Sequence, residues 1–335
     1  MKVLIIHAAS AGEVIFSTPL IRAIKTHDAR AGIYYVTTSS GKLALEENAL
    51  VSATYDVKQG VLKLYRELQG HSFDMVIDLD RNFLSYILTR LTQGRLLYGP
   101  KASWLTNFVR RKSAESTEQT HLVERYLRVL DSTEISQHQH PLDFTIPYKD
   151  EVPLSWLPEP YSKGYVVLCI QAQYATRRLP VKRMVELCDR INKPIIILGE
   201  THDQEDGNEI EKFFKRTDKT NQYEEGLQAL NKKAEVYNGC GKFNFHQRAS
   251  LIKQAQYVFT FDNDCIAIAS AFEKYVFSIW GNTVLQSGRY PYQTGFTIFE
   301  KNNLACRPCS TKGYAHCPLK HFKCMNDIVF DFYLP

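Results

Sequence analysis

Three polar residues, Asp262, Asn263 and Asp264, stand where the sequence is expected to pass from a strand into a helix. Tyr257–Phe261 is β-branched and aromatic, as in a buried strand, and Ile266–Phe272 has the apolar spacing of a helix. Such a unit aims its loop at the carboxyl edge of a parallel sheet, where α/β proteins bind ligands. N–H groups at a helix start suit an anion such as a diphosphate. The alternative is a plain βαβ unit in which Asp262 only caps the helix.

Two other stretches carry groups that could act on such an anion. Arg177 and Arg178 lie in an expected loop, Gln171–Pro180, and their forked guanidinium groups match phosphate oxygens. Glu13 begins a helical pattern after the small-residue loop Ala8–Gly12, where it either complements the helix dipole or serves as a general base. A base that deprotonates an acceptor hydroxyl, with cations that stabilise a departing diphosphate, suits group transfer from a nucleotide sugar.

Polar and basic residues elsewhere are weaker candidates. Asp80 and Arg81 follow the buried run Phe73–Leu79, so they either contact a substrate or form a solvated turn. Gly12 lets the backbone turn tightly or approach a ligand closely. The basic run Arg110-Arg111-Lys112 is a solvated face or, alternatively, a contact for an anionic lipid or glycolipid.

Short apolar runs alternate with helical patterns along the chain, which predicts an α/β protein with doubly wound parallel sheets. The segment Pro141–Pro160 holds five prolines and is the strongest linker signal. We therefore expect two Rossmann-like domains, residues 1–150 and 151–335, whose facing carboxyl edges leave a central cleft. The expected strands are Lys2–His7, Gly32–Thr37, Ala53–Val57, Phe73–Leu79, Gly94–Tyr98, Gly164–Ile170, Pro194–Leu198, Val236–Asn238, Tyr257–Phe261 and Val276–Trp280, and the segment after Thr283 is expected to be irregular.

The composition restricts the class of protein. Hydrophobic residues make up 44% of the 335 residues and charged residues 23%, which excludes a disordered chain. A formal charge of +5 is too small for a dedicated nucleic-acid binder, so no nucleic-acid partner is expected. It fits anionic small molecules or a position near an anionic membrane. No apolar run approaches the roughly 20 residues that span a bilayer, and Val3–Ile6 is too short for a signal-peptide core, so we expect a cytoplasmic protein.

The eight cysteines are then expected to be thiols or metal ligands rather than disulfides. Cys306 and Cys309 form a CxxC pair, and Cys317 and Cys324 follow it. Four thiolates could hold a structural zinc, but the wide second spacing favours free thiols or a local bridge. The other four, Cys169, Cys188, Cys240 and Cys265, lie in strand or helix patterns and are expected in the core.

Several segments, in order, resemble the glycosyltransferase family 9 heptosyltransferases of bacterial lipopolysaccharide synthesis. The opening KVLIIHAASAGEVIFSTPLIRAIK is similar to the family's strand, Ser-rich loop, Gly-Asp pair and Thr-Pro helix. VIDLDRN resembles its Asp-Leu-His-Lys-Asn segment, HLVERYL its His-Val-x-Asp-Arg-Tyr helix, and ATRRLPVKRMVELCDRI its Thr/Ser-Lys-Arg-x-Pro loop and helix. FDNDCIAIASAFEKYVFSIWGNT resembles its Asp-Thr/Ser-Gly-x-x-His segment and Gly-x-Thr end, and CRPC…HC…FKCMND its Cys-rich tail.

The resemblance implies a GT-B fold, with the acceptor on the N-terminal domain and an ADP-sugar on the C-terminal domain. It implies inverting transfer of a heptose-like sugar to a lipopolysaccharide or other cell-envelope glycan, without a metal or cofactor. The glycolipid acceptor would bring the protein into peripheral contact with the inner membrane face. The implied site has Glu13 as catalytic base, Thr176, Arg177, Arg178, Asp262, Asn263 and Asp264 at the donor, and Ser10, Gly12, Asp80 and Arg81 at the acceptor.

The departures from the family pattern fall in this site. Glu13 replaces the family's catalytic Asp, and Arg177 replaces its phosphate-binding Lys. Asn263 and Asp264 replace the residues after its Asp, and Ala267 replaces its His. A charge on Asp264 about 4 Å from a diphosphate would cost on the order of 4 kcal/mol at an effective dielectric of 20.

Alternatives to an active transferase therefore remain open. One is a catalytically weak or inactive relative that serves as a binding or scaffolding protein. Another is a nucleotide-sugar epimerase or hydrolase on the same two-domain plan, against which the Cys-rich tail argues. The sequence does not identify the sugar, the acceptor or the oligomeric state.

Overall fold

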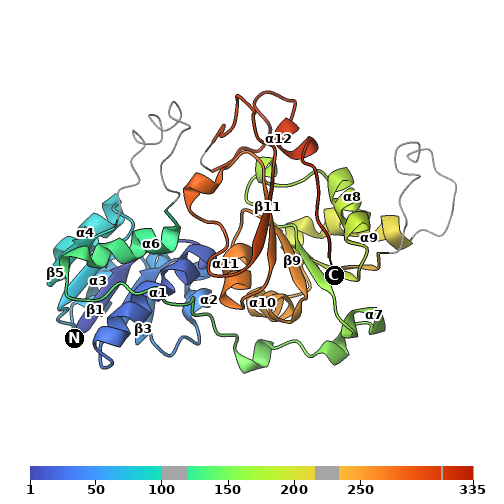
Figure 1. Ribbon diagram of the computed structural model, residues 1–335. Helices are drawn as coiled ribbons and strands as arrows, with labels where there is room; N and C mark the ends of the chain where they lie inside the picture. The colour runs from blue at the N-terminus through green and yellow to red at the C-terminus, as the bar shows by residue number, and fades with distance from the viewer. Residues whose placement is uncertain (100–119, 216–233, 311, 335) are drawn as a thin grey trace. The chain divides into compact units, whose positions relative to one another are not determined.

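The computed structural model describes residues 1–99, 120–215, 234–310 and 312–334. The chain divides into two compact units, unit 1 at Met1–Thr145 and unit 2 at Ile146–Pro335, so the division falls inside the proline-rich segment. Figure 1 draws unit 1 in blue to green, from β1 to α6, and unit 2 in green to red, from α7 to α12. The basic run Arg110-Arg111-Lys112 lies outside the described residues.

Unit 1 is built on a parallel sheet whose central strands β1 and β4 are buried, because helices cover both of its faces. The strand order is β3-β2-β1-β4-β5. The chain adds strands outward from β1 to β3 on one side and then from β4 to β5 on the other, so the switch point lies between β1 and β4. Neighbouring strands pair in register, with Leu4 opposite Tyr34 on one side and Val76 on the other. The strands are β1 (Lys2–Ile6), β2 (Gly32–Thr37), β3 (Ala53–Asp56), β4 (Met75–Asp78) and β5 (Arg95–Tyr98).

The helices of unit 1 form two layers. Right-handed crossovers place α1 and α2 on one face of the sheet and α3 and α4 on the other, and each pair is in contact. The second face holds a core in which Leu64, Leu68 and Leu88 pack on Leu4 and Ile6. The helices are α1 (Ala11–His27), α2 (Ser39–Leu45), α3 (Val61–Leu68), α4 (Phe83–Leu91) and α6 (Leu122–Leu127), the last of which packs on α1.

Helix α1 differs from the prediction, because it begins at Ala11 rather than at Glu13 and continues through Pro19. A proline removes the N–H that would bond to the carbonyl four residues earlier, here that of Ile15. The Thr18 hydroxyl donates to this carbonyl at 2.7 Å and supplies the missing bond. Pro19 is therefore accommodated inside the helix.

Unit 2 has a six-stranded parallel sheet in the order β11-β10-β9-β6-β7-β8, the doubly wound order of a Rossmann fold. Edge strand β11 lies in the segment that was expected to be irregular, and it pairs with β10 along all five residues. The strands are β6 (Val166–Cys169), β7 (Ile195–Leu198), β8 (Val236–Asn238), β9 (Tyr257–Phe261), β10 (Val276–Trp280) and β11 (Phe296–Glu300).

Helices α8 and α9 of unit 2 contact each other, as do α10 and α11. After α12 the chain runs without regular structure, and Ile328 and Phe330 are buried in the sheet core. Arg183 of α8 lies 4.9 Å over the Phe330 ring and its Nη2 donates to the Ile328 carbonyl, so this end of the chain is fixed on α8. The helices are α7 (Glu159–Ser162), α8 (Val181–Ile191), α9 (Gln204–Lys215), α10 (Phe245–Gln254), α11 (Cys265–Ala271) and α12 (Lys323–Asn326).

Among the described residues, the longest apolar helices fall short of what crossing a bilayer requires.

Candidate functional site

The strand order of unit 2 reverses between β6 and β9, and the loops after these two strands are joined by Asn263. Its Nδ2 donates to the Gln171 carbonyl at 2.9 Å. Its Oδ1 accepts from the Thr260 hydroxyl at 2.9 Å and from the backbone N–H of Cys265 at 2.8 Å. Asn263 therefore holds the two loops together at the position where a doubly wound sheet binds its ligand.

Arg177 and Asp262 form a buried ion pair at this edge. Arg177 comes from the 3₁₀ turn Ala175–Arg177 after β6, and Asp262 follows β9. The Arg177 Nη2 donates to the Asp262 Oδ2, and the two residues are only 8% and 4% exposed. The interpretation of Asp262 as a helix cap is wrong, because Asp264 occupies that position and Asp262 pairs with the guanidinium.

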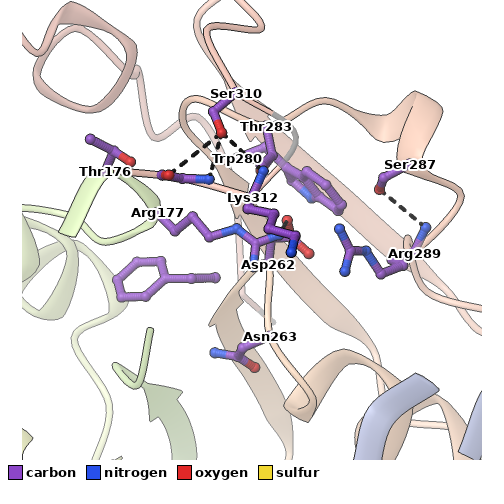
Figure 2. Close-up of polar contacts among 12 residues, drawn as sticks. Thr176, Arg177, Asp262, Asn263, Trp280, Thr283, Ser287, Arg289, Ser310 and Lys312 are labelled. Atoms are coloured by element: carbon purple, nitrogen blue, oxygen red, sulfur yellow. Dashed lines mark hydrogen bonds and ion pairs between the residues drawn. The ribbon is translucent and has the colours of Figure 1, made fainter. Parts of the chain in front are cut away.

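Two cations that sequence reasoning missed also approach this pair. Figure 2 shows the side chains of Lys312 and Arg289 directed toward the Arg177–Asp262 pair. Lys312 belongs to the Cys-rich tail, which is attached to the β6 loop because Tyr314 and Thr176 exchange hydrogen bonds: Tyr314 N to Thr176 Oγ1 at 2.8 Å and Thr176 N to the Tyr314 carbonyl at 3.2 Å. Lys312 and Arg289 therefore lie at the same edge of unit 2 as the Arg177–Asp262 pair.

Arg178 is directed elsewhere. Its guanidinium contacts Asp203, which is fully buried, at 2.5 Å and Asp206 at 2.6 Å. Asp203 ends the 3₁₀ turn before α9 and Asp206 is in the first turn of α9, so Arg178 ties the β6 loop to the start of that helix. Its role in donor binding stays a prediction.

Glu200 is a further carboxylate that the sequence analysis did not single out. It follows the carboxyl end of β7, and its Oε1 accepts from Arg248 Nη2 at 2.7 Å. In Rossmann folds an acidic residue after the second strand binds ribose hydroxyls. Its place after PIIILG was the signal that could have identified it.

The corresponding edge of unit 1, between β1 and β4, gathers carboxylates. Asp80 Oδ2 accepts from the Ala8 N–H at 2.6 Å, which joins the β1 and β4 loops. Asp78 Oδ1 accepts from the N–H groups of Asp80 and Arg81, at 3.0 and 2.8 Å, and holds Arg81 at a left-handed φ of 53°. The backbone of this turn is therefore held by the Asp78 and Asp80 side chains, while Arg81 is exposed.

Glu13 belongs to the same edge. It is the third residue of α1, and its N–H bonds to the Oγ of Ser10, the N-cap residue, at 3.4 Å. Burial, with the charges of Asp78 and Glu13, raises the pKa of the Asp80 carboxyl to about 6, against the hydrogen bond from Ala8. Gly12 is helical and makes no tight turn; its close approach to a ligand stays a prediction.

His7 lies beneath this edge in a buried polar chain. Its Nδ1 is 3.0 Å from the Tyr35 hydroxyl and its Nε2 is 3.0 Å from the Tyr126 hydroxyl. The Tyr35 hydroxyl is also 2.7 Å from Ser17 Oγ. Burial lowers the pKa of the His7 imidazole to about 4. The ring is therefore neutral at pH 7.

This shift predicts an acid-sensitive fold. Between pH 6.5 and pH 4 the unfolded chain binds a proton at His7 and the folded chain does not, so the free energy of unfolding falls as the pH falls. Lowering the pH through this window should cost about 3 kcal/mol, and the His7→Gln variant should lose this dependence. Urea unfolding across the pH range measures it. His138→Gln, at an exposed position, is the control, and parallel pH profiles for wild type and His7→Gln would contradict the assignment.

The Cys-rich tail contains four unbridged thiols, Cys306, Cys309, Cys317 and Cys324. Cys306 Sγ is 3.8 Å from His321 Nε2. Within the part of the chain that the structure describes, no three His, Cys, Asp or Glu side chains are grouped to hold a metal ion. Arg307 attaches this segment to the loop after β10, because its guanidinium donates to the carbonyls of Gly281 and Thr283 at 2.6 and 3.0 Å.

Comparison with known proteins adds to this geometry. A family model described as glycosyltransferase family 9 (heptosyltransferase) matches residues 61–320, more than half of the chain. The chain belongs to glycosyltransferase family 9. It is 26% identical over 156 residues to lipopolysaccharide heptosyltransferase 3 of Escherichia coli (strain K12), a match that covers 42% of this chain and 44% of that protein.

Solved structures of the family share the fold. A family 9 glycosyltransferase from Veillonella parvula DSM 2008 aligns with a TM-score of 0.67 and 16% identity, over 89% of this chain and 85% of that one. The E. coli ADP-heptose heptosyltransferase II aligns with a TM-score of 0.65 and 15% identity, over 98% of both chains. An E. coli heptosyltransferase solved with ADP aligns at 0.64 and 18%, over 89% and 93%. The two Rossmann-like parallel sheets of the predicted GT-B fold are thereby confirmed.

The structure thus groups the predicted residues by unit. Thr176, Arg177, Asp262 and Asn263 meet at the carboxyl edge of unit 2, and Asp264 is the N-cap residue of α11 beside them. Ser10, Glu13, Asp80 and Arg81 meet at the carboxyl edge of unit 1. That the two groups face one cleft stays a prediction.

Proposed function

We propose that this chain transfers a heptose-like sugar from an ADP-sugar to a lipopolysaccharide or another cell-envelope glycan, with inversion at the anomeric carbon and without a metal. The observation that carries the proposal is the Arg177–Asp262 pair at the unit 2 edge, toward which the side chains of Lys312 and Arg289 are directed. Family membership supplies the reaction class. The solved E. coli relative with ADP-2-deoxy-2-fluoro heptose supports the donor class by analogy.

On the donor side, the diphosphate would meet charges already fixed in position. Asp262 holds the Arg177 guanidinium, so little conformational entropy is lost when it pairs with phosphate oxygens. Lys312 and Arg289 would take up the charge that develops on the leaving ADP, the task that a metal performs in other transferases. Glu200, at the end of the second strand, is suited to the ribose hydroxyls.

On the acceptor side, Glu13 would act as the base. It takes the proton of an acceptor hydroxyl as that oxygen attacks the anomeric carbon and the bond to the diphosphate breaks. A single displacement of this kind inverts the carbon. Asp80 and Arg81, with Ser10, would position the acceptor around Glu13, and an amphiphilic acceptor would bring the protein to the inner face of the membrane.

Calorimetric titration of the purified chain with ADP and with ADP-heptose tests the donor assignment. We expect heat with both ligands and micromolar affinity, about 8 kcal/mol of binding free energy. Added salt should weaken the binding of ADP, because the contacts to its diphosphate are ionic. A titration with UDP serves as the control for selectivity between the adenine and uracil nucleobases. No heat with ADP or ADP-heptose would contradict the proposal.

A binding or scaffolding role is the second candidate, because Glu13, Arg177, Asn263 and Asp264 all differ from the family pattern. Asp264 is the N-cap residue of α11 and has helical backbone angles, and its side chain makes no capping bond. A carboxylate there opposes an anionic ligand. Donor binding without transfer to any envelope glycan would favour this candidate.

A further inference from the structure

Two adjacent polar side chains of unit 2, Asn282 and Thr283, are buried without hydrogen bonds. Asn282 is 1% exposed and Thr283 is 2% exposed. Among the residues that the structure describes, neither the Nδ2 and Oδ1 of Asn282 nor the Oγ1 of Thr283 has a partner. Leaving a buried polar group unpaired costs free energy, so nearly all such groups in folded proteins are bonded. Three unpaired atoms in neighbouring residues therefore call for a ligand.

The two residues lie at the carboxyl edge that holds the Arg177–Asp262 pair. They follow β10, which pairs with β9 up to Ile279 opposite Phe261, so the loop after β10 begins beside Asp262. This loop also touches the β6 loop, because a Cβ added to Gly281 would lie 2.9 Å from the Thr176 carbonyl oxygen. Figure 2 draws Thr283 in the same group of side chains as Lys312 and the ion pair.

The backbone of this loop is fixed, although the two side chains are not. The Arg307 guanidinium donates to the carbonyls of Gly281 and Thr283, at 2.6 and 3.0 Å. The Asn282 carboxamide and the Thr283 hydroxyl make no hydrogen bond that would have to break before they turned toward a ligand. The loop therefore presents both groups from a position that is already set, which lowers the entropy that binding costs.

The strand order places the candidate donor groups along one line. At the carboxyl edge of unit 2, β7, β6, β9 and β10 are consecutive neighbours. Glu200 follows β7, and the loop with Asn282 and Thr283 follows β10. The ion pair lies between them, after β6 and β9. Strands about 4.8 Å apart give this line a length of about 14 Å. A nucleotide sugar with its ribose at Glu200 and its diphosphate at the ion pair therefore extends its sugar toward β10.

The chemistry of the two side chains fits the sugar rather than the diphosphate. The oxygens of an ionised phosphate only accept hydrogen bonds, whereas the Oδ1 of Asn282 also only accepts and needs a donor. A sugar hydroxyl both donates and accepts, so it can serve the carboxamide of Asn282 and the hydroxyl of Thr283 together. The cations of this edge suit the charged part of the ligand, and Asn282 and Thr283 suit a neutral part that carries hydroxyl groups.

We propose that Asn282 and Thr283 form the subsite for the transferred sugar of the donor and exchange hydrogen bonds with its hydroxyl groups. This inference rests on the proposed function, because it takes the ligand to be a nucleotide sugar. A site built to bond hydroxyl groups rejects an analogue that lacks them, since its own polar groups are then left unpaired. The two residues thereby contribute to the choice of sugar, a property that the diphosphate contacts do not provide.

Calorimetric titration of the full chain with ADP-heptose and with ADP tests the proposal. Thr283→Val removes the hydroxyl and keeps nearly the same shape, and Asn282→Leu replaces the carboxamide. Each variant should bind ADP-heptose about tenfold more weakly than the wild type and ADP within about twofold of it. Thr283→Ser keeps the hydroxyl and should bind ADP-heptose as the wild type does. The melting temperature of Thr283→Val should not fall, because the hydroxyl that it removes has no partner in the fold.

Thr37→Val is the matched control. Thr37 ends β2 in unit 1, is fully buried, and has an Oγ1 without a hydrogen-bond partner among the described residues. The substitution therefore removes the same kind of group from the other unit. Its affinities for ADP-heptose and for ADP should equal those of the wild type.

Two results would overturn the proposal. One is an unchanged affinity for ADP-heptose in both Thr283→Val and Asn282→Leu. The other is an equal loss of affinity for ADP and ADP-heptose, which would mean that the two residues support the diphosphate site rather than contact the sugar. Failure of the proposed function is distinct, because the wild type itself would then give no heat with either ligand. Wild-type binding with unchanged variants would remove only the sugar subsite.

Discussion

Replacing Glu13 with glutamine is expected to lower the rate of sugar transfer by about 10²- to 10⁴-fold, the contribution of a general base. Binding of the ADP-sugar should be unchanged, because Glu13 belongs to unit 1 and the proposed donor groups to unit 2. The fold should survive, because Ser10 caps α1 through the backbone N–H of residue 13 and the amide is nearly the same size. Initial rates with ADP-heptose and acceptor, alongside calorimetry with the donor, measure both effects.

The matched variant is Glu13→Asp, which keeps the carboxylate but withdraws it by about one methylene. Because misplacement by about 1 Å costs on the order of 10²-fold, it should be slower than the wild type and faster than Glu13→Gln. This order separates base chemistry from simple packing, since aspartate changes the shape more than glutamine does. Transfer by Glu13→Gln at the wild-type rate would remove Glu13 from the mechanism.

The fold was predictable because its signal is local. Buried parallel strands such as Ile195–Leu198 are continuous apolar runs, and each is followed by a helical pattern. Edge strand β11 was missed because it has the opposite character: Phe296 is exposed and only Phe299 is fully buried, so the run lacks the expected apolar pattern. Helix α1 continues through Pro19, which the local sequence disfavours, because the Thr18 hydroxyl supplies the missing hydrogen bond.

The site was only partly predictable, because its charged side chains pair with residues that are distant in the sequence. Asp262 has the local features of a helix cap, yet its partner is Arg177, 85 residues earlier. The adjacent Arg178 looks equivalent in the sequence, but it is committed to Asp203 and Asp206. Lys312 had no local signal at all, since only the attachment of the Cys-rich tail to Thr176 brings it to this edge.

Replacing Arg177 with methionine should lower the free energy of unfolding by about 3–5 kcal/mol. The substitution keeps the volume of the aliphatic chain but leaves the Asp262 carboxylate, only 4% exposed, without its guanidinium. Removing Asp262 at the same time, as Arg177→Met/Asp262→Leu, should recover most of the loss, because an apolar pair can replace a buried ion pair at little cost. Urea unfolding of the two single variants and the double variant gives the coupling energy.

Lys163→Met supplies the matched control. Lys163 pairs with Glu159 at 3.5 Å, but their side chains are 80% and 85% exposed, so its removal should change stability by less than about 1 kcal/mol. If Arg177→Met were no more destabilising than Lys163→Met, the buried pair would contribute nothing to the fold. The double variant separates two roles of Arg177. If the double variant recovers stability but not affinity for ADP, then Arg177 both pairs with Asp262 and binds the diphosphate. Recovery of both would mean that the pair is structural and that the donor is held by Lys312 and Arg289.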